Sequence, residues 1–162
     1  MKEIKLTQGQ VALIDDEDFE YLNQFKWYAM KTKHNDYVSR DEVINGVSTR
    51  ILMHRLIMKT PVGVMTDHID HNGLNNQKHN LRLCTNGQNL MNRRPRESSK
   101  YLGVYVIKTI RKKSVYKSIR ADITVNKKTI HLGSFKTEED AALAYNEAAL
   151  KYHGEFANPN VI

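Results

Sequence analysis

The chain has 162 residues, of which 40% are apolar and 27% charged, so it can form one ordinary domain or two small ones. It contains no run of about 18 apolar residues, and its N-terminal segment lacks the apolar stretch of a signal peptide. We therefore expect an intracellular protein that neither crosses nor binds a membrane. The single cysteine, Cys84, excludes an internal disulfide and a cysteine-based zinc site, so a metal site would use oxygen and nitrogen ligands.

The positive charge of the chain is concentrated in one segment. Lys and Arg outnumber Asp and Glu by 25 to 18, which gives a net charge of +7. Residues 93–136 contain 13 basic residues and only two acidic ones, Glu97 and Asp122, so this segment carries +11 and the rest of the chain −4. Its residues alternate as in strands and not as in an amphipathic helix, which favours nucleic acid over a membrane surface as the partner.

The first 60 residues are expected to be β-rich. A strong two-residue turn signal, Asn45-Gly46, predicts a hairpin between residues 43–44 and a strand that runs to Met53. Short apolar runs predict further strands at 4–6, 11–14, 27–30 and 37–40.

Two short helices are expected in the same region. The acidic run at 15–20 predicts a solvated turn, in preference to a carboxylate metal site, and leads into a helix at 21–25. A second helix is predicted at 54–58 and must end before Pro61, because proline cannot continue a helix.

Residues 62–94 form a polar, loop-rich segment in which only Leu81 and Leu83 alternate as a clear strand. Asp, His, Asn and Gly replace the alternating apolar residues here. The stretch at 93–100 contains a proline and no apolar residue, which predicts a basic linker and a domain boundary.

The final third of the chain has the clearest alternation. Strands are predicted at 101–108, at 114–125 and from 129 to 132, with turns at 111–113 and 126–128. A helix is expected to begin after the N-cap Thr137 and to end at Gly154. One stripe of this helix should cover the apolar face of the sheet and leave the other face bare; it consists of Ala141, Ala144, Tyr145, Ala148, Ala149 and Tyr152.

The residues between Asp67 and Asn89 suit the cleavage of a phosphodiester, which requires a base to activate water and a hard cation to neutralise developing charge. His68 has the ordinary pKa of such a base. Asp67 and Asn89 offer oxygen donors, which are appropriate to Mg²⁺ or Mn²⁺. Because adjacent residues of a regular strand point to opposite sides, the chain must bend at Asp67-His68 to bring both into one site.

This segment resembles the HNH nucleases, in particular the asparagine-ended, phage-type homing endonucleases with a ββα-metal motif, and the resemblance covers residues 64–92 with the internal spacing intact. It implies a β-hairpin followed by a helix that together hold one divalent metal ion, Mg²⁺ or Mn²⁺. On this resemblance, Asp67 and Asn89 are the metal ligands, His68 is the general base, and Asn80 orients the base through its backbone.

Several neighbours of these residues have no assigned catalytic role. The family commonly has glycine where this chain has His71, which we interpret as a loop residue, together with Asp70 and His79. The pair His54-Arg55 resembles a His-Arg pair found upstream in these nucleases. It could contact DNA or brace the site, and a packed, hydrogen-bonded structural pair is an equal alternative.

Residues 101–162 resemble the plant APETALA-two or ethylene-response-factor DNA-binding domain, through Tyr101-Leu102-Gly103-Val104, residues 131–135 and residues 138–149. The resemblance implies a three-stranded antiparallel sheet backed by one helix, with the exposed sheet face in the major groove of DNA. The candidates on that face are Tyr105, Arg120, Asp122, Thr124, Thr129 and His131. The lysines and arginines of the turns, edges and linker are expected to meet phosphates: Arg93, Arg94, Arg96, Lys108, Arg111, Lys112, Lys113, Lys117, Lys127 and Lys128.

Three positions depart from the plant pattern. Leu102 stands where an arginine is usual, Ile119 replaces a frequent aromatic residue, and Asp122 places a negative charge on the exposed face. Asp122 could accept a hydrogen bond from cytosine or pair with Arg120.

Together these patterns predict an α+β protein. A β-rich region with the HNH motif spans 1–92, a linker spans 93–100, and a three-stranded antiparallel sheet packed on one helix spans 101–162. We expect a metal-dependent, homing-type endonuclease that nicks double-stranded DNA as a monomer, with a dimer as the alternative. Its expected location is the host cytoplasm, as the product of a phage or prophage gene. The competing hypothesis is a non-catalytic, sequence-specific DNA-binding regulator with a degenerate HNH scaffold.

Overall fold

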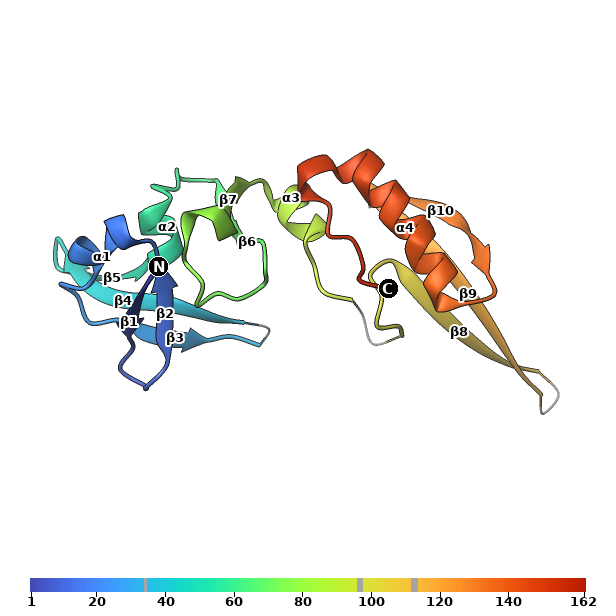
Figure 1. The fold of residues 1–162 in the computed structure, drawn as a ribbon, viewed down its shortest axis with the longest axis horizontal. Helices are drawn as coiled ribbons and strands as arrows, with labels where there is room; N and C mark the ends of the chain where they lie inside the picture. The colour runs from blue at the N-terminus through green and yellow to red at the C-terminus, as the bar shows by residue number, and fades with distance from the viewer. Residues whose placement is uncertain (34, 96–97, 112–113) are drawn as a thin grey trace. The chain divides into compact units, whose positions relative to one another are not determined.

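The computed structural model describes residues 1–33, 35–95, 98–111 and 114–162 (Figure 1). The chain divides into two compact units, an N-terminal unit of residues 1–86 and a C-terminal unit of residues 87–162. Within the described ranges, no helix combines the length and the apolar character needed to span a lipid bilayer.

Two antiparallel sheets form the first part of the N-terminal unit. One consists of β1 (Lys2–Lys5) and β2 (Val11–Ile14); the other has the order β3-β4-β5, from β3 (Tyr28–Lys31), β4 (Asp36–Ile44) and β5 (Val47–Leu52). The predicted hairpin turn is confirmed, because Asn45 and Gly46 join β4 to β5 with φ angles of 51° and 78°, the left-handed values that a tight two-residue turn requires.

The acidic run folds differently from its prediction. Helix α1 (Asp16–Leu22) begins inside this run, so the predicted solvated turn and the predicted helix at 21–25 are both wrong. Three acidic residues in the first turn stabilise the positive end of the helix dipole, and burial of Leu22 in the core favours the helix over a solvated turn. The second predicted helix is present as α2 (Met53–Ile57) and begins one residue early.

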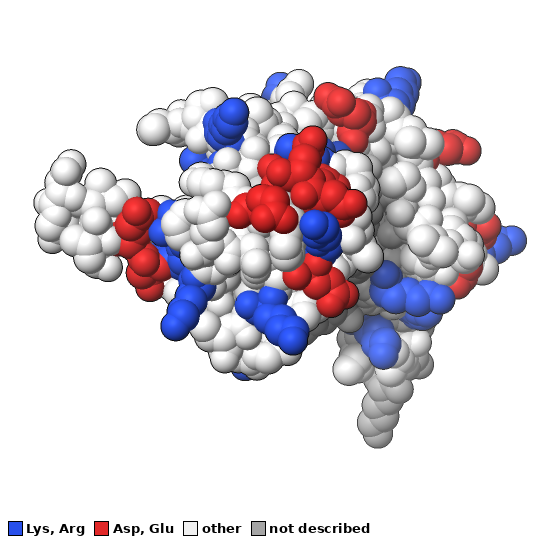
Figure 2. Space-filling model, turned by 60° about the vertical axis from the view of Figure 1, so that its left-hand side comes forward, with Lys and Arg blue, Asp and Glu red and all other residues white. Residues whose placement is uncertain are grey.

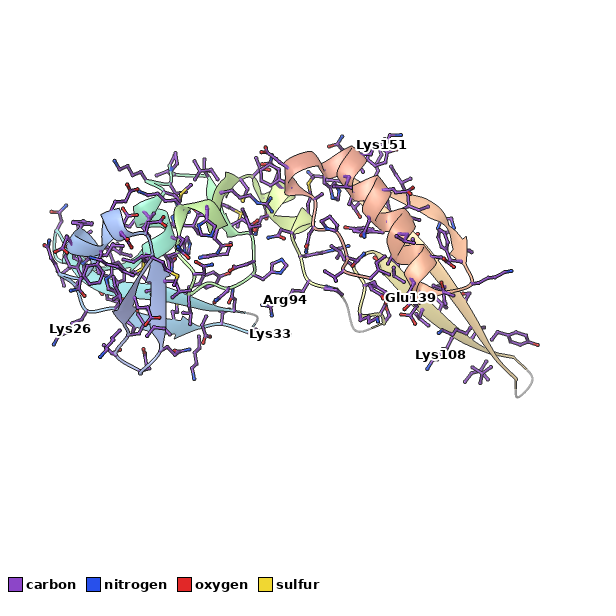
Figure 3. The ribbon with its side chains drawn as sticks, viewed as in Figure 1. Lys26, Lys33, Arg94, Lys108, Glu139 and Lys151 are labelled. Atoms are coloured by element: carbon purple, nitrogen blue, oxygen red, sulfur yellow. The ribbon has the colours of Figure 1, made fainter. Side chains whose placement is uncertain are left out.

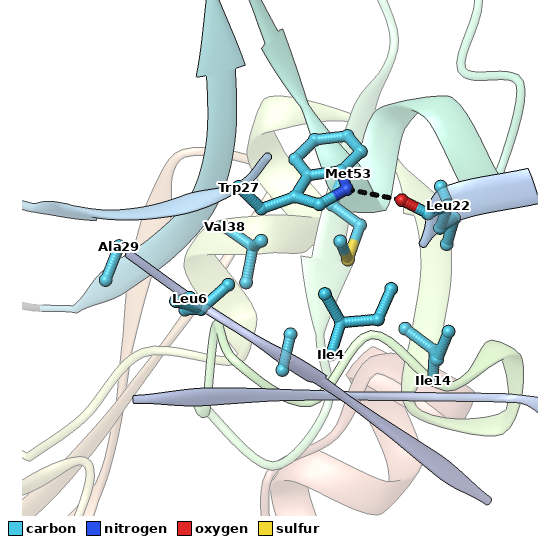
Figure 4. Packing of buried hydrophobic residues seen from close by; sticks show 9 residues of the cluster. Ile4, Leu6, Ile14, Leu22, Trp27, Ala29, Val38 and Met53 are labelled. Carbon is cyan, nitrogen blue, oxygen red and sulfur yellow. Dashed lines mark hydrogen bonds between the residues drawn. The ribbon is translucent and has the colours of Figure 1, made fainter. Parts of the chain in front are cut away.

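The core of the N-terminal unit gathers side chains from both sheets and both helices around Trp27 (Figure 4). Ile14, Leu22, Val38 and Met53 are at most 1% exposed, and Trp27 is fully buried. The indole Nε1 of Trp27 donates to the carbonyl oxygen of Leu22 at 2.8 Å, which satisfies its only polar atom. Leu74, from the polar segment that follows α2, packs against this core.

The polar segment forms a third, two-stranded sheet of β6 (Met65–His68) and β7 (Leu81–Cys84), joined by residues 69–80. The joining segment ends in a short 3₁₀ helix, η1 (Lys78–Asn80), and β7 is followed by α3 (Asn86–Met91). We call residues 69–80 the joining loop. It lies along β2, since the N–H of Leu13 donates to Leu74 O (2.9 Å) and that of Asn76 donates to Leu13 O (2.7 Å).

Gly73 marks the closest approach of the joining loop to the main sheet. A Cβ atom at this position would lie 2.2 Å from the carbonyl oxygen of Asp36 in β4. Only glycine fits there, because real Cβ atoms do not approach backbone oxygen so closely.

The C-terminal unit contains one antiparallel sheet of order β10-β9-β8, with α4 packed against one face. Its elements are β8 (Val104–Arg111), β9 (Ser114–Val125), β10 (Lys128–Phe135), α4 (Glu138–His153) and the 3₁₀ helix η2 (Gly154–Phe156). The first strand therefore starts and ends three residues later than the predicted 101–108.

Both predicted ends of α4 are confirmed. The side chain of Thr137 accepts from the N–H of Asp140 at 3.1 Å, and Gly154 closes the helix with a φ of 56°. The predicted apolar stripe needs one correction: Tyr152 is 42% exposed, whereas Ala142 and His153 are buried. His153 takes the buried place because its Nε2 bonds the carbonyl oxygen of Thr124 at 3.1 Å.

Gly103 allows the chain to pass against α4 at the entry to the sheet. Its φ of +75° lies in the left-handed region, and a Cβ atom would lie 2.0 Å from the ring of Tyr145. Tyr145, Leu102, Ile123 and Ala149 form the core beneath it.

Candidate active site and nucleic-acid interface

His68 lies at the end of β6, where the chain bends. The N–H of Ile69 donates to the carbonyl oxygen of Asn80 (2.9 Å) and that of His71 to the carbonyl oxygen of His68 (3.1 Å). His71 has a left-handed φ of 61°, which accounts for the glycine that is common at this position in the resembling family. The bend predicted at Asp67-His68 itself is therefore wrong: both residues lie in regular register in β6, opposite Arg82 and Leu81, and the chain turns only after His68. Both side chains are nevertheless buried.

Asn76 holds the ring of His68. This asparagine is fully buried, its Nδ2 donates to Gly73 O (3.4 Å), and its Oδ1 lies 3.3 Å from Nε2 of His68. Because an amide oxygen only accepts hydrogen bonds, this contact places the proton on Nε2 and leaves Nδ1 as the basic nitrogen of the neutral ring. Sequence reasoning missed Asn76, although the Asn-rich loop was the signal that could have indicated it.

The pKa of His68 is lowered by burial, an effect that the hydrogen bond with Asn76 and the negative charges of Asp70 and Asp67 oppose. A neutral imidazole is the form that can accept a proton.

Asn80 closes the joining loop. Its side chain is 4% exposed and makes three hydrogen bonds: Oδ1 accepts from the N–H of Asp70 (3.0 Å), and Nδ2 donates to Asp70 Oδ1 (2.9 Å) and to Asn75 O (2.8 Å). The backbone carbonyl oxygen of Asn80 also accepts from the N–H of Ile69. Asn80 therefore holds Ile69 and Asp70, the two residues that follow His68, in place. This geometry is compatible with the orienting role predicted for Asn80, which stays a prediction.

Asp70 belongs to the same framework. Its carboxylate also accepts from the N–H of Asn72 and from Nδ2 of Asn75, both at 2.8 Å. Burial raises the pKa of Asp70, but these hydrogen bonds outweigh it and the pKa is lowered overall. Asp70 therefore acts as a structural loop residue, and His79 is exposed on η1.

Asp67, the predicted metal ligand on β6, is paired with Arg82 opposite it on β7. Nε and Nη2 of Arg82 donate to Asp67 Oδ2 at 3.0 and 2.9 Å, and the carboxylate is 7% exposed. Arg82 fixes the direction of the carboxylate, a role that its place in the motif alone did not reveal. The other predicted ligand, Asn89, lies on α3 within the C-terminal unit.

The donor chemistry of Asp67 and Asn89 fits a hard divalent cation. A carboxylate and an amide are oxygen donors, and Mg²⁺ usually takes only one or two protein ligands and keeps several waters. Among the residues that the structure describes, no group of three or more His, Cys, Asp or Glu side chains is arranged to hold a metal. A closed, all-protein cage of the zinc type is therefore not formed by the described residues.

His54 and Tyr37 pack around His68. The ring of His54 stands edge-on to that of His68 with 4.9 Å between centroids, and Tyr37 lies 5.5 and 5.9 Å from the two histidines. His54 is 5% exposed, and among the residues that the structure describes its Nδ1 has no hydrogen-bond partner. Burial, together with positive charge on His68 and Arg55, lowers the pKa of His54 to about 3, so this ring stays neutral.

Arg55 supports the chain that enters β6. Its Nη1 donates to Val64 O (2.9 Å) and its Nη2 to Pro61 O (3.2 Å). The hydrogen bonds of Arg55 and the burial of His54 agree with the alternative of a packed, hydrogen-bonded structural pair. The contact between His54 and His68 is also compatible with the alternative in which the pair braces the site.

The net charge of the protein resides in the C-terminal unit. The N-terminal unit has 11 basic and 11 acidic residues, whereas the C-terminal unit has 14 basic and 7 acidic residues, which accounts for the whole +7. Acidic side chains are also clustered, since α1 alone contains Asp16, Glu17, Asp18 and Glu20, and Figure 2 shows acidic side chains gathered in a patch on the face it draws. The excess of positive charge is therefore a property of the C-terminal unit.

The sheet face opposite α4, which we call the outer face, carries a connected polar group. Strand register places Tyr105 beside Arg120 and Asp122 beside His131. Asp122 Oδ1 lies 2.8 Å from His131 Nδ1, Oδ2 lies 3.1 Å from Arg120 Nε, and the Arg120 guanidinium lies 5.4 Å from the ring centroid of Tyr105. Both carboxylate oxygens of Asp122 are thus engaged, which supports pairing with Arg120 over acceptance from cytosine. Thr124 and Thr129 continue the outer face.

The predicted phosphate-contacting residues are distributed over several elements. Lys108 and Lys117 face each other on β8 and β9, and Lys127 and Lys128 are exposed at the β9–β10 turn. Arg93 and Arg94 lie between α3 and the sheet; Arg94 and Lys108 are labelled in Figure 3. Arg96, Lys112 and Lys113 lie outside the described residues, and Arg111 is described only as the last residue of β8.

Comparison with known proteins identifies one informative relative. The chain is 33% identical, over 157 residues, to a protein of Acanthamoeba polyphaga mimivirus described as an uncharacterized HNH endonuclease; the match covers 96% of this chain and 77% of the relative. No protein-family model and no solved structure matches the chain. This level of identity over almost the whole chain shows that the protein belongs to the HNH endonuclease family.

Proposed function

We propose that this protein is a divalent-metal-dependent endonuclease that hydrolyses phosphodiester bonds of double-stranded DNA. The observation that carries the proposal is the arrangement around His68: a buried imidazole at a chain bend, held through Nε2 by Asn76, within a loop closed by Asn80. Family membership supports the same reaction class.

In the proposed step, His68 removes a proton from a water molecule through Nδ1. The water oxygen forms a bond to phosphorus, and the bond from phosphorus to the 3′ oxygen breaks. The departing 3′ oxygen takes a proton from solvent, and the imidazole later returns its proton to solvent. A Mg²⁺ or Mn²⁺ ion held by Asp67 and Asn89 would supply positive charge for the phosphate and the departing oxygen. Arg82 keeps the Asp67 carboxylate in a fixed direction, and Asn76 keeps the His68 ring in the tautomer that can accept the proton.

The C-terminal unit would hold the DNA. Its surplus of basic residues and the group of Tyr105, Arg120 and His131 on its outer face support this role, with the APETALA-two-like resemblance of its sequence. One catalytic histidine per chain would cut one strand, so we propose a nicking enzyme that acts as a monomer. Two copies would be needed for a double-strand break. We also propose that the enzyme is a homing-type endonuclease.

A plasmid assay tests the proposal. Purified protein is incubated with supercoiled plasmid and with DNA of its own source genome, in Mg²⁺, in Mn²⁺ and in chelator. We expect metal-dependent nicking that falls by about 10²- to 10⁴-fold in His68→Ala, the usual contribution of a general base. His79→Ala is the matched control, because His79 is an exposed histidine of the same hairpin and should retain activity. Binding without cutting on every DNA, or nicking that survives in His68→Ala, would contradict the proposal.

A further inference from the structure

The outer face of the sheet carries two kinds of side chain along the β8–β9 hairpin, whereas α4 covers the opposite face (Figure 1). Near Arg120 it bears the charged group with Asp122 and His131. Toward the hairpin turn it bears apolar and hydroxyl side chains, because alternate residues of a strand share a face. We call this second part the distal outer face; it consists of Ile107 and Thr109 on β8 and Tyr116 and Ser118 on β9.

Ile107 and Tyr116 place apolar surface on the distal outer face. Ile107 is 38% and Tyr116 59% exposed, and among the described residues neither belongs to the two apolar cores that join the sheet to α4. They are diagonal neighbours, since Ile107 pairs with Ser118 and Tyr116 with Thr109. The lining of an open depression on this part of the face includes Thr109, Tyr116 and Ser118. The distal outer face therefore offers an accessible apolar surface with hydroxyl groups beside it.

The charge of the outer face is compatible with DNA as the partner. Of the residues that the structure describes in this sheet, Asp122 is the only acidic one, and both of its carboxylate oxygens are engaged by Arg120 and His131. The C-terminal unit as a whole has 14 basic and 7 acidic residues, so it attracts a polyanion. A DNA duplex that approaches the outer face therefore meets no uncompensated negative charge on the described part of the sheet.

The chemistry of the distal outer face matches one feature of the major groove. The 5-methyl group of thymine is the apolar group that base pairs present there, and apolar side chains contact it. Arginine instead contacts guanine most commonly, and serine and threonine can bond to several bases. Ile107 and Tyr116 are therefore suited to thymine, whereas Arg120, on the same face of β9 as Tyr116, is suited to guanine.

We infer that Ile107 and Tyr116 determine sequence specificity by contacting the 5-methyl groups of thymines in the major groove, next to the base contacts of Arg120. Diagonal neighbours on two antiparallel strands lie about 7 to 8 Å apart, and base pairs are stacked about 3.4 Å apart. The thymines that the two side chains contact therefore lie within about three base pairs of each other. This inference rests on the proposed DNA-binding role of the C-terminal unit and names residues that read the sequence.

Replacement of thymine by uracil provides the test, because it removes only the 5-methyl group and leaves base pairing unchanged. Duplexes that bind the full chain are first selected from a random library in chelator, so cleavage is not required. Uracil then replaces the thymines of a selected duplex one position at a time, and affinity is measured by fluorescence anisotropy. For the wild type, neighbouring substitutions should each weaken binding about fourfold, the loss expected for one buried methyl group.

The variant Ile107→Ser/Tyr116→Ser should bind the thymine duplex as weakly as the wild type binds the uracil duplex, and should not respond to uracil. The matched control, Ile110→Ser/Val115→Ser, removes a pair that is 76% and 65% exposed on the opposite face of the same strands. This control should keep the response of the wild type. Circular dichroism verifies that both variants fold, and the uracil scan of the wild type requires no substitution in the protein.

Wild-type affinity that depends on no thymine methyl group would overturn the inference, and so would a full loss on uracil that persists in Ile107→Ser/Tyr116→Ser. An equal change in both variants would also overturn it, because the outer pair would then stabilise the hairpin without contacting bases. If the wild type bound no DNA, the proposed DNA-holding role would fail together with the inference. Nicking of plasmid in Mg²⁺, scored separately, shows whether the proposed nuclease function stands when the methyl contacts do not.

Discussion

Replacing Asn80 by alanine should destabilise the N-terminal unit and disorganise the site together. The substitution removes three hydrogen bonds, one of them to the Asp70 carboxylate, from a side chain that is 4% exposed. It leaves the N–H of Asp70 and the carbonyl oxygen of Asn75 without this partner. Neutral hydrogen bonds contribute about 1 kcal/mol each and charged ones about 1.5 to 3 kcal/mol, so the expected loss is about 3 to 5 kcal/mol.

The protein contains its own probe for this loss. Trp27 is the single tryptophan of the chain and is fully buried in the core of the N-terminal unit. Urea unfolding followed by its fluorescence therefore reports on this unit. The control is Asn23→Ala, an exposed position at the end of α1, where a change within about 0.5 kcal/mol is expected.

The reasoning would be refuted if Asn80→Ala lost less than about 1 kcal/mol, since that is the worth of a single hydrogen bond. In that case the joining loop would be held mainly by its contacts with β2, and the hydrogen bonds of the Asn80 side chain would not be what stabilises it. The urea titration also gives the fraction of Asn80→Ala that is folded without urea. Dividing its nicking rate by this fraction separates a loss of activity from a loss of folding.

Three further changes test other parts of the structure. His54→Phe should make the free energy of unfolding less dependent on pH in acid. The pKa of His54 is about 3 in the folded protein and about 6.5 in the unfolded chain, so between these pH values the unfolded state binds more protons. The free energy of unfolding of the wild type should therefore fall by up to about 1.4 kcal/mol per pH unit as the pH is lowered through this window. An equal slope in both proteins would count against the buried neutral ring. Gly73→Ala should lower the urea midpoint of the N-terminal unit, because its Cβ would lie 2.2 Å from Asp36 O; an unchanged midpoint would show that the loop can move away. Asp122→Asn should raise affinity for random DNA in anisotropy titrations and reduce discrimination by about 1 to 3 kcal/mol, since Arg120 is no longer held, and retained discrimination would contradict this.

Local signals in the sequence predicted elements whose causes are local. The β4–β5 turn follows from Asn45-Gly46, and both ends of α4 follow from Thr137 and Gly154, because each depends on a few neighbouring residues. The start of α1 was missed because acidic residues suit both a solvated turn and the first turn of a helix, and burial of Leu22 decides between them.

The site required information at longer range. The spacing of Asp67, His68 and Asn80 indicated the hairpin and its chemistry, as the resemblance to HNH nucleases implied. The contacts that orient these residues come from elsewhere: Arg82 is 15 positions from Asp67, and His54 reaches His68 from α2. Such contacts depend on strand register and packing, which no short window of sequence specifies.

The boundary between the two units also depends on contacts between residues that are far apart in the sequence. The basic linker was predicted at 93–100 from its composition, whereas the division into compact units falls between Asn86 and Gly87. Composition identifies where the chain becomes polar, but the limits of a unit depend on which residues pack together. The charge pattern was more informative, since its excess lies wholly in residues 87–162.

The most direct test of the central claim is the nicking rate of the wild type and His68→Ala on supercoiled plasmid in Mg²⁺, with His79→Ala beside them. The account predicts that the wild type and His79→Ala nick at similar rates, that chelator stops both, and that His68→Ala is slower by about 10²- to 10⁴-fold while binding DNA equally well. Equal rates for His68→Ala and the wild type would contradict the assignment of His68 as the base that activates water.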